Sequence, residues 1–164
     1  MTHRYLIALG SNRRHHRHGA PERVLALALD RLAEDGLAVE ARSPVIRSAP
    51  IGPSLRRYAN GAAVVETELD PPALLVLLKR VEREFGRRSG GQRWGTRVLD
   101  LDIVLWSGGC WSSPSLTVPH REFRKRRFVL DPAAAIAPRG RDPVSGLTLR
   151  QLRARLTRLE RLPR

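Results

Sequence analysis

Residues 98–105 have the composition of a buried β-strand, yet they include two aspartates. The run is apolar and rich in β-branched residues, whereas aspartate is normally depleted from strands. Because side chains alternate across a strand, Asp100 and Asp102 share one face, and the apolar residues beside them share the other. The sequence therefore predicts a core strand that presents two neighbouring carboxylates on one face.

Two carboxylates held this close repel each other unless a cation neutralises them. Hard divalent ions with oxygen ligands, Mg²⁺ above all, suit such a pair. We therefore interpret Asp100 and Asp102 as candidate metal ligands. The alternative is that they line the solvated face of an amphipathic strand and form ion pairs with nearby arginines.

The segment before this strand is rich in arginine and glycine. Guanidinium groups bind phosphate oxygens bidentately, and glycines allow close approach of the backbone to a ligand. Metal-binding carboxylates after such a loop indicate phosphoryl-type transfer from a nucleotide. The arginines are Arg87, Arg88, Arg93 and Arg97, and the glycines are Gly86, Gly90, Gly91 and Gly95.

The composition limits the class of protein. The chain of 164 residues predicts one domain, residues 1–164, and the single cysteine, Cys110, fits a reducing compartment. Neither a secretory signal nor a membrane-length apolar run is visible, so we expect a soluble cytoplasmic protein with no membrane partner. The net charge of +14 raises the possibility of nucleic-acid binding, but the arginines are spread along the whole chain.

Hydrophobic periodicity predicts alternating strands and helices. Strands are expected at 4–9, where Gly10-Ser11-Asn12 would form a turn, and at 37–47, 58–68 and 98–105, with a short one at 110–112. One helix is expected to begin at Pro21 and to stop at Gly36. A second is expected to begin at Pro71, with Asp70 as its N-cap, and to stop at Gly86. Two further helices are expected at 128–136 and 147–159. The order strand, helix, strand, strand, helix, strand predicts a ferredoxin-like α+β fold, an antiparallel sheet with helices on one face and additional C-terminal elements.

Residues 13–18, Arg-Arg-His-His-Arg-His, are predicted to form an exposed, mobile basic loop. Three of the four residues 15–18 are histidines, which could instead bind a transition metal. No cysteine or acidic residue accompanies them, however, so the loop interpretation is favoured.

Several motifs along the chain resemble those of the 6-hydroxymethyl-7,8-dihydropterin pyrophosphokinase family. The Arg-Trp-Gly to Asp-Leu-Asp segment, followed by Val-Pro-His, is the most specific of them. The motifs are Tyr-Leu-Ile-Ala-Leu-Gly-Ser-Asn at 5–12, Ala-Pro-Ile-Gly-Pro at 49–53, Tyr-Ala-Asn at 58–60, Arg-Trp-Gly-Thr-Arg-Val-Leu-Asp-Leu-Asp at 93–102, Leu-Thr-Val-Pro-His at 116–120 and Arg-Arg-Phe-Val-Leu at 126–130.

The resemblance implies that ATP, as co-substrate, donates its β,γ-pyrophosphoryl group to the pterin hydroxymethyl oxygen, releasing AMP in folate biosynthesis. By this likeness Asp100 and Asp102 hold two Mg²⁺ ions. The catalytic residues would be Arg87, Arg97, Asp100 and Asp102, and the ATP-binding residues Lys79, Glu82, Arg93, Trp94, His120 and Arg126, with Lys79 and Glu82 on the exposed face of the second helix.

On the pterin side the resemblance implies Ser48, Pro50, Ile51, Gly52, Tyr58, Asn60 and Phe128. A flat heterocycle stacks well between aromatic rings. An asparagine side chain provides both a hydrogen-bond donor and an acceptor to the edge of such a heterocycle. The alternatives are that Tyr58 and Phe128 are ordinary core residues and that His120 is a capped loop histidine.

The sequence departs from the family pattern at Thr96, where proline is usual, and at Ser115, where arginine is common. These departures leave open a pterin- or nucleotide-binding relative with little catalytic activity. A basic nucleic-acid-binding module is a further alternative, although aromatic residues are only 5% of the chain and no RNA-binding motif is present. We expect small-molecule substrates, no specific nucleic acid and a monomer.

Overall fold

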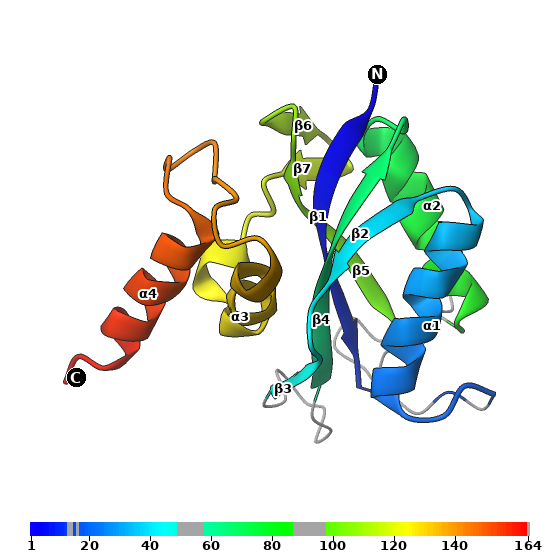
Figure 1. Ribbon diagram of the computed structural model, residues 1–164, viewed down its shortest axis with the longest axis horizontal. Helices are drawn as coiled ribbons and strands as arrows, with labels where there is room; N and C mark the ends of the chain where they lie inside the picture. Colours follow the sequence, from blue (N-terminus) through cyan, green and yellow to red (C-terminus); the bar gives the residue numbers. More distant parts are fainter. Residues whose placement is uncertain (13–14, 16, 49–57, 87–97, 164) are drawn as a thin grey trace.

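The computed structural model describes residues 1–12, 15, 17–48, 58–86 and 98–163 (Figure 1). Strands and helices follow one another nearly as the sequence predicts. They are β1 (His3–Ser11), α1 (Pro21–Glu34), β2 (Ala38–Arg42), β3 (Ile46–Ser48), β4 (Tyr58–Thr67), α2 (Pro71–Glu84), β5 (Asp100–Trp106), β6 (Trp111–Ser113), β7 (Leu116–Val118), the 3₁₀ turn η1 (Phe123–Lys125), α3 (Arg127–Ile136) and α4 (Leu149–Glu160).

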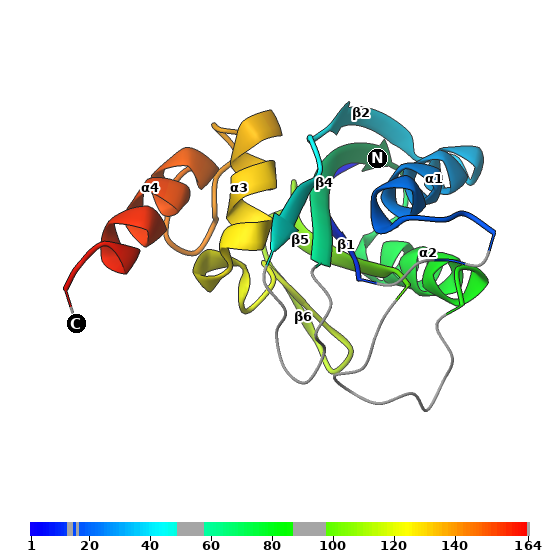
Figure 2. The ribbon, with the colours of Figure 1, turned by 90° about the horizontal axis from the view of Figure 1, so that it is seen from below.

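An antiparallel sheet forms the centre of the molecule, with the strand order β2-β4-β1-β5 and β3 paired to β4. Helices α1 and α2 cover one face, and α3, with α4 beyond it, lies on the other (Figures 1 and 2). The order and pairing of the four longer strands are those of a ferredoxin-like fold, which confirms the predicted α+β class.

Capping residues fix the helix ends. The Asp70 carboxylate accepts a hydrogen bond from the Ala73 N–H at 3.1 Å, so α2 begins at Pro71 as predicted. The helix ends before Gly86, whose φ of +98° is costly for residues with a side chain. Since β5 follows α2 in the chain, this stop helps to determine where the aspartate-bearing strand starts.

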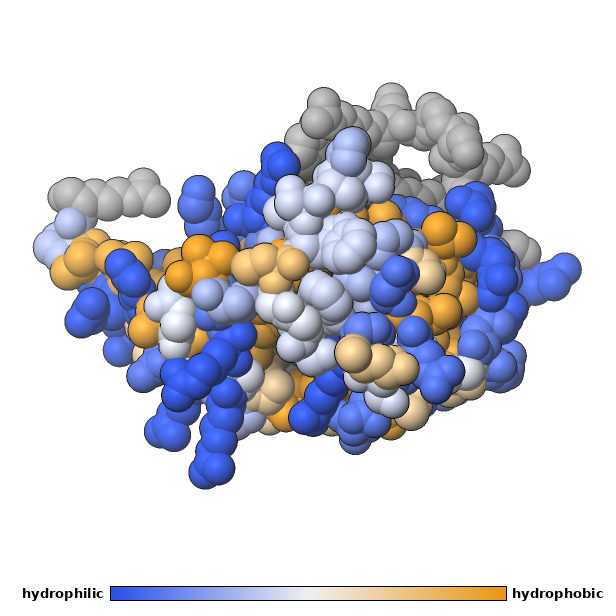
Figure 3. All heavy atoms as spheres, turned by 90° about the horizontal axis from the view of Figure 1, so that it is seen from above, coloured by the Kyte–Doolittle hydropathy of each residue, from blue (hydrophilic) through white to orange (hydrophobic). Residues whose placement is uncertain are grey.

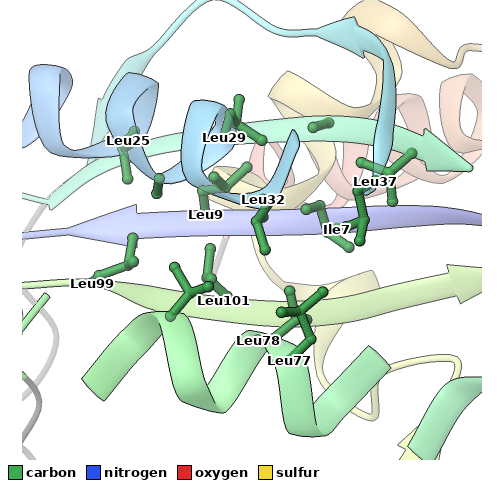
Figure 4. Close-up of a cluster of buried hydrophobic side chains, with 14 of the residues drawn as sticks. Ile7, Leu9, Leu25, Leu29, Leu32, Leu37, Leu77, Leu78, Leu99 and Leu101 are labelled. Carbon is green, nitrogen blue, oxygen red and sulfur yellow. The ribbon is translucent and has the colours of Figure 1, made fainter. Parts of the chain in front are cut away.

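Two sets of apolar side chains hold the layers together. The larger lies between the sheet and α1 and α2, and includes Ile7, Leu32, Leu78, Leu99 and Leu101 (Figure 4). The smaller lies between the sheet and α3, and its members include Leu6, Val104, Phe123, Leu130 and Leu149. The sheet is therefore buried on both faces over much of its area.

Two predicted boundaries are wrong. The strand expected at 37–47 is divided into β2 and β3, because Pro44 has no N–H for the ladder and the Ser43 hydroxyl instead accepts the Ala62 N–H at 2.8 Å. Residues 10–12 do not form a turn that ends the first strand, because β1 continues through Gly10 and Ser11, which pair with Asn60 and Ala59 of β4.

The surface carries most of the charge. Hydrophilic side chains project from the edges of the face in Figure 3, and hydrophobic residues lie in small areas between them. No helix in the described part of the chain combines the length and apolarity that a membrane crossing requires.

Candidate active site

Strand β5 places Asp100 and Asp102 on the face of the sheet that α3 covers. Its Leu101 and Ile103 side chains belong to the core beneath α1 and α2, so alternation turns the aspartates toward the opposite face. Asp100 pairs with Gly10 of β1 and Asp102 with Ala8. Both carboxylates remain partly exposed, which confirms the predicted arrangement of two neighbouring carboxylates on one face.

His120 lies beside Asp102 because its backbone is bonded to the same strand. Its N–H donates to the Val104 carbonyl at 3.1 Å, and the ring Nδ1 accepts from the Glu122 N–H at 3.2 Å. Burial lowers the pKa of His120; the Asp102 carboxylate opposes this effect and the Arg126 guanidinium adds to it. The neutral ring with Nδ1 as acceptor carries its proton on Nε2, where it can donate to an anionic ligand.

Arg126 and Phe128 complete this side of the site. Arg126 is the residue before α3, and its guanidinium carbon lies 5.7 Å from the centroid of the Phe128 ring. Phe128 is partly buried against the core beneath α3. A positive charge and a partly open aromatic ring therefore lie on the same side of the sheet as the aspartates.

Gly10 lies between the aspartates and the residues assigned to the pterin. It pairs with Asp100 on one side and with the buried Asn60 on the other. A Cβ at this position would come within 3.4 Å of Asn60 Oδ1 and 3.8 Å of the Tyr58 ring. Ser48 pairs with Tyr58 at the end of β3. Gly10 is not among the site residues predicted from the sequence, although it belongs to the Leu-Gly-Ser-Asn motif.

Glu82 was predicted to lie on the exposed face of α2, but this prediction is wrong. The residue is buried, with 1% of its surface exposed. Its Oε1 accepts a hydrogen bond from the Leu101 N–H at 2.9 Å, and its Oε2 lies 3.5 Å from Lys79 Nζ. Leu101 stands between the two aspartates, so Glu82 supports the backbone that carries them. The Lys79 side chain is 42% exposed, in agreement with its predicted placement.

Seven of the predicted site residues lie outside the described residues. They belong to the two segments 49–57 and 87–97 and comprise Pro50, Ile51, Gly52, Arg87, Arg93, Trp94 and Arg97.

His15 and His18 are less exposed than the predicted loop implies. His15 is 6% exposed, and its Nδ1 accepts the N–H groups of Arg17 and His18. Its ring stacks on the His18 ring at 4.4 Å between centroids with an interplanar angle of 20°, and both rings contact Phe85. Lone pairs in two stacked planes do not converge, so His15 and His18 do not share a metal ion in this arrangement.

Comparison with known proteins identifies the family to which the chain belongs. Residues 6–138 match the family described as 7,8-dihydro-6-hydroxymethylpterin-pyrophosphokinase (HPPK). Two curated relatives are called 2-amino-4-hydroxy-6-hydroxymethyldihydropteridine pyrophosphokinase. The one from Pseudomonas aeruginosa is 41% identical, and the match covers 99% of each chain. The one from Synechocystis is also 41% identical, over 71% of this chain and 60% of the relative.

Solved structures share the fold. A crystal structure of Plasmodium falciparum HPPK-DHPS with pteroate matches 98% of this chain with a TM-score of 0.72, at 14% sequence identity. This chain covers 43% of that longer chain. The sequence match along most of the chain shows that the protein belongs to the 7,8-dihydro-6-hydroxymethylpterin-pyrophosphokinase family.

Proposed function

We propose that this chain transfers the β,γ-pyrophosphoryl group of ATP to the hydroxymethyl oxygen of 6-hydroxymethyl-7,8-dihydropterin, giving the pterin diphosphate and AMP. The family and the names of the relatives support this reaction. The structural observation that carries it is the pair Asp100 and Asp102 on one face of β5, with His120 and Arg126 beside it.

The two aspartates fit Mg²⁺. They supply hard oxygen donors, and within the described residues Asp102 makes no ion pair with a side chain. No third His, Cys, Asp or Glu of those residues joins a metal-binding group with them. Mg²⁺ usually takes one or two carboxylates and completes its shell with water and substrate phosphates. We therefore assign two Mg²⁺ ions to Asp100 and Asp102, where they would orient the triphosphate and neutralise its charge.

The side chains around the aspartates would bind and orient the nucleotide. His120 would donate from Nε2 to a phosphate oxygen, and Arg126 would bind the phosphates by charge. We assign Lys79 to the nucleotide side as well. The resemblance implies that Glu82 contacts the nucleotide, but we assign it instead to the support of β5 through the Leu101 N–H. From the segments outside the described residues we propose Arg87 and Arg97 as catalytic residues, and Arg93 and Trp94 as nucleotide ligands.

The pterin would lie on the other side of Gly10. Tyr58 and Phe128 would supply aromatic faces, and Asn60 would bond the edge of the heterocycle. Ser48, Pro50, Ile51 and Gly52 would complete this side. We further propose that residues 1–164 form a single domain that acts as a cytoplasmic monomer on small molecules, without a specific nucleic-acid or membrane partner.

The test is AMP formation from ATP and 6-hydroxymethyl-7,8-dihydropterin with Mg²⁺. AMP should form in step with the pterin diphosphate, and Asp100→Ala and Asp102→Ala should abolish both products while leaving the circular dichroism spectrum unchanged. Asp30→Ala is the matched control, because this exposed aspartate pairs with Arg42 far from the site and should leave turnover intact.

Two other outcomes would contradict the proposal. Saturable binding of pterin and nucleotide without AMP would identify a catalytically weak relative. Salt-dependent binding of random RNA, unaffected by pterin and ATP, would identify the basic nucleic-acid-binding module instead.

A further inference from the structure

We propose that the ion pair between Arg124 and the buried Asp142 is a positioning device, which holds the turn between His120 and Arg126 in the geometry that nucleotide binding needs. The inference rests on the proposed function and extends it to two residues that do not touch the substrates. Neither residue belongs to the candidate site. Asp142 lies in the segment between α3 and α4.

A single short turn determines how His120 and Arg126 stand relative to each other. The N–H of Arg126 donates to the Phe123 carbonyl at 3.3 Å, and the N–H of Lys125 to the Glu122 carbonyl at 3.1 Å. The Phe123 side chain is fully buried and fixes the turn to the core beneath α3. Any rotation of η1 therefore moves both of these site residues.

Arg124 extends from the same turn to Asp142. Its Nε and Nη2 donate to the two carboxylate oxygens of Asp142 at 2.6 and 2.7 Å, and its guanidinium carbon lies 4.6 Å from the centroid of the Phe123 ring. A bidentate pair of this kind restricts both distance and orientation. Because Arg124 also covers Phe123, the pair resists rotation of the turn.

Asp142 is itself rigidly held. Its side chain is fully buried and also accepts from the Ser145 hydroxyl at 2.6 Å and from the Val144 N–H at 3.1 Å. Its backbone closes the loop through bonds to Leu147 and Gly146. This loop runs directly into α4, whose first turn is capped by Thr148. The loop between α3 and α4 therefore anchors the turn through residues that are not part of the candidate site.

The sequence offers a matched control. Arg153 of α4 donates to Asp131 of α3 at 2.7 Å, so its ion pair joins the two C-terminal helices and does not involve a charged residue of η1. If the two C-terminal helices only stabilise the fold, neither Arg153→Lys nor Arg124→Lys should change nucleotide binding by the folded protein. If Arg124 positions the turn, only the second should change nucleotide binding.

The experiment measures binding and kinetics on the full chain. Calorimetry with Mg²⁺ and a non-transferable ATP analogue gives nucleotide affinity, and a second titration at saturating analogue gives pterin affinity. Asp142→Asn and Arg124→Lys should weaken nucleotide binding by about tenfold and pterin binding by less than about twofold, since small misplacements of positioning groups cost up to about 10² in rate. The KM for ATP should rise in parallel.

The outcomes separate the two proposals. Folded Asp142→Asn and Arg124→Lys proteins with wild-type affinity for the analogue would overturn the positioning role. Two further results would also overturn it: an equal loss of affinity for the analogue and for the pterin, or an equal loss of analogue affinity in Arg153→Lys. Arg124→Lys retains the charge and provides the test if Asp142→Asn fails to fold. A wild-type protein that binds the analogue without forming AMP would refute only the proposed function, whereas one that binds no nucleotide would refute both.

Discussion

Replacing Glu82 with alanine should cost about 3 kcal/mol of unfolding free energy. The bond from the Leu101 N–H to the Glu82 carboxylate is buried, and hydrogen bonds to charged groups contribute roughly 1.5–3 kcal/mol. The lost side-chain packing adds about 0.8 kcal/mol per buried methylene. The Lys79 pair adds less than about 1 kcal/mol, because its lysine is 42% exposed.

The same variant should also weaken the proposed metal site. Leu101 lies between Asp100 and Asp102 in β5. Once its N–H loses the Glu82 partner, this part of the strand can shift, and the two carboxylates then move out of the positions in which they would hold the metal ions. We expect the Mg²⁺ concentration for half-maximal AMP formation to rise by about tenfold, which corresponds to about 1.4 kcal/mol. Glu82→Gln keeps an acceptor oxygen and should lose only about 1 kcal/mol of stability.

Urea unfolding and Mg²⁺ titration of turnover measure the two effects. Glu84→Ala is the control, because Glu84 lies on the same helix but pairs at the surface with Arg31, and its loss should cost less than about 1 kcal/mol. If the unfolding free energy of Glu82→Ala is within about 0.5 kcal/mol of the wild-type value, the stability prediction is refuted. An unchanged Mg²⁺ dependence would refute the coupling between Glu82 and the aspartates.

Three further predictions follow from the site and its support. Gly10→Val should raise the KM for pterin more than the KM for ATP in steady-state assays, because its side chain would displace Asn60. Mg²⁺ with an ATP analogue at about 100 times Kd should stabilise the protein by about 2.7 kcal/mol in thermal unfolding, an effect that EDTA or Asp102→Asn removes. Burial alone would raise the pKa of Asp142, but hydrogen bonds, led by that from Arg124, lower it to about 2. The ionised Asp142 therefore contributes its full stabilisation of the folded state above the ordinary pKa of 3.8, and this contribution is lost as pH falls toward 2. The stability difference between wild type and Asp142→Asn should therefore shrink by about 2 kcal/mol between about pH 5 and pH 2 in urea titrations.

The order of the helices and strands and the orientation of the two aspartates could be predicted from the sequence. Both depend on local periodicity: Leu99, Leu101 and Ile103 needed burial, so the aspartates had to face the other side. The position of Glu82 also carried a local signal that was overlooked. It lies four residues after Leu78 and three before Phe85, on the apolar side of α2, where a carboxylate needs a buried partner.

Other features depend on residues that are distant in the sequence. The bonds from Arg124 to Asp142 and from His120 to Val104 form only when the C-terminal layer packs on the sheet, and no spacing in the sequence specifies them. The continuation of β1 through Gly10 and Ser11 was hidden by their turn-forming composition. Pairing with β4 overrides that local preference.

The bonds that support the active site have a second consequence, for self-association. Strand β5 is at the end of the sheet, where unpaired N–H and C=O groups can recruit a strand from another molecule. Glu82 occupies the outward N–H of Leu101, and the His120 amide occupies the carbonyl of Val104. The contacts that set the geometry of the aspartates thus also block this edge against intermolecular β-pairing, so variants that release them should aggregate sooner as well as react more slowly.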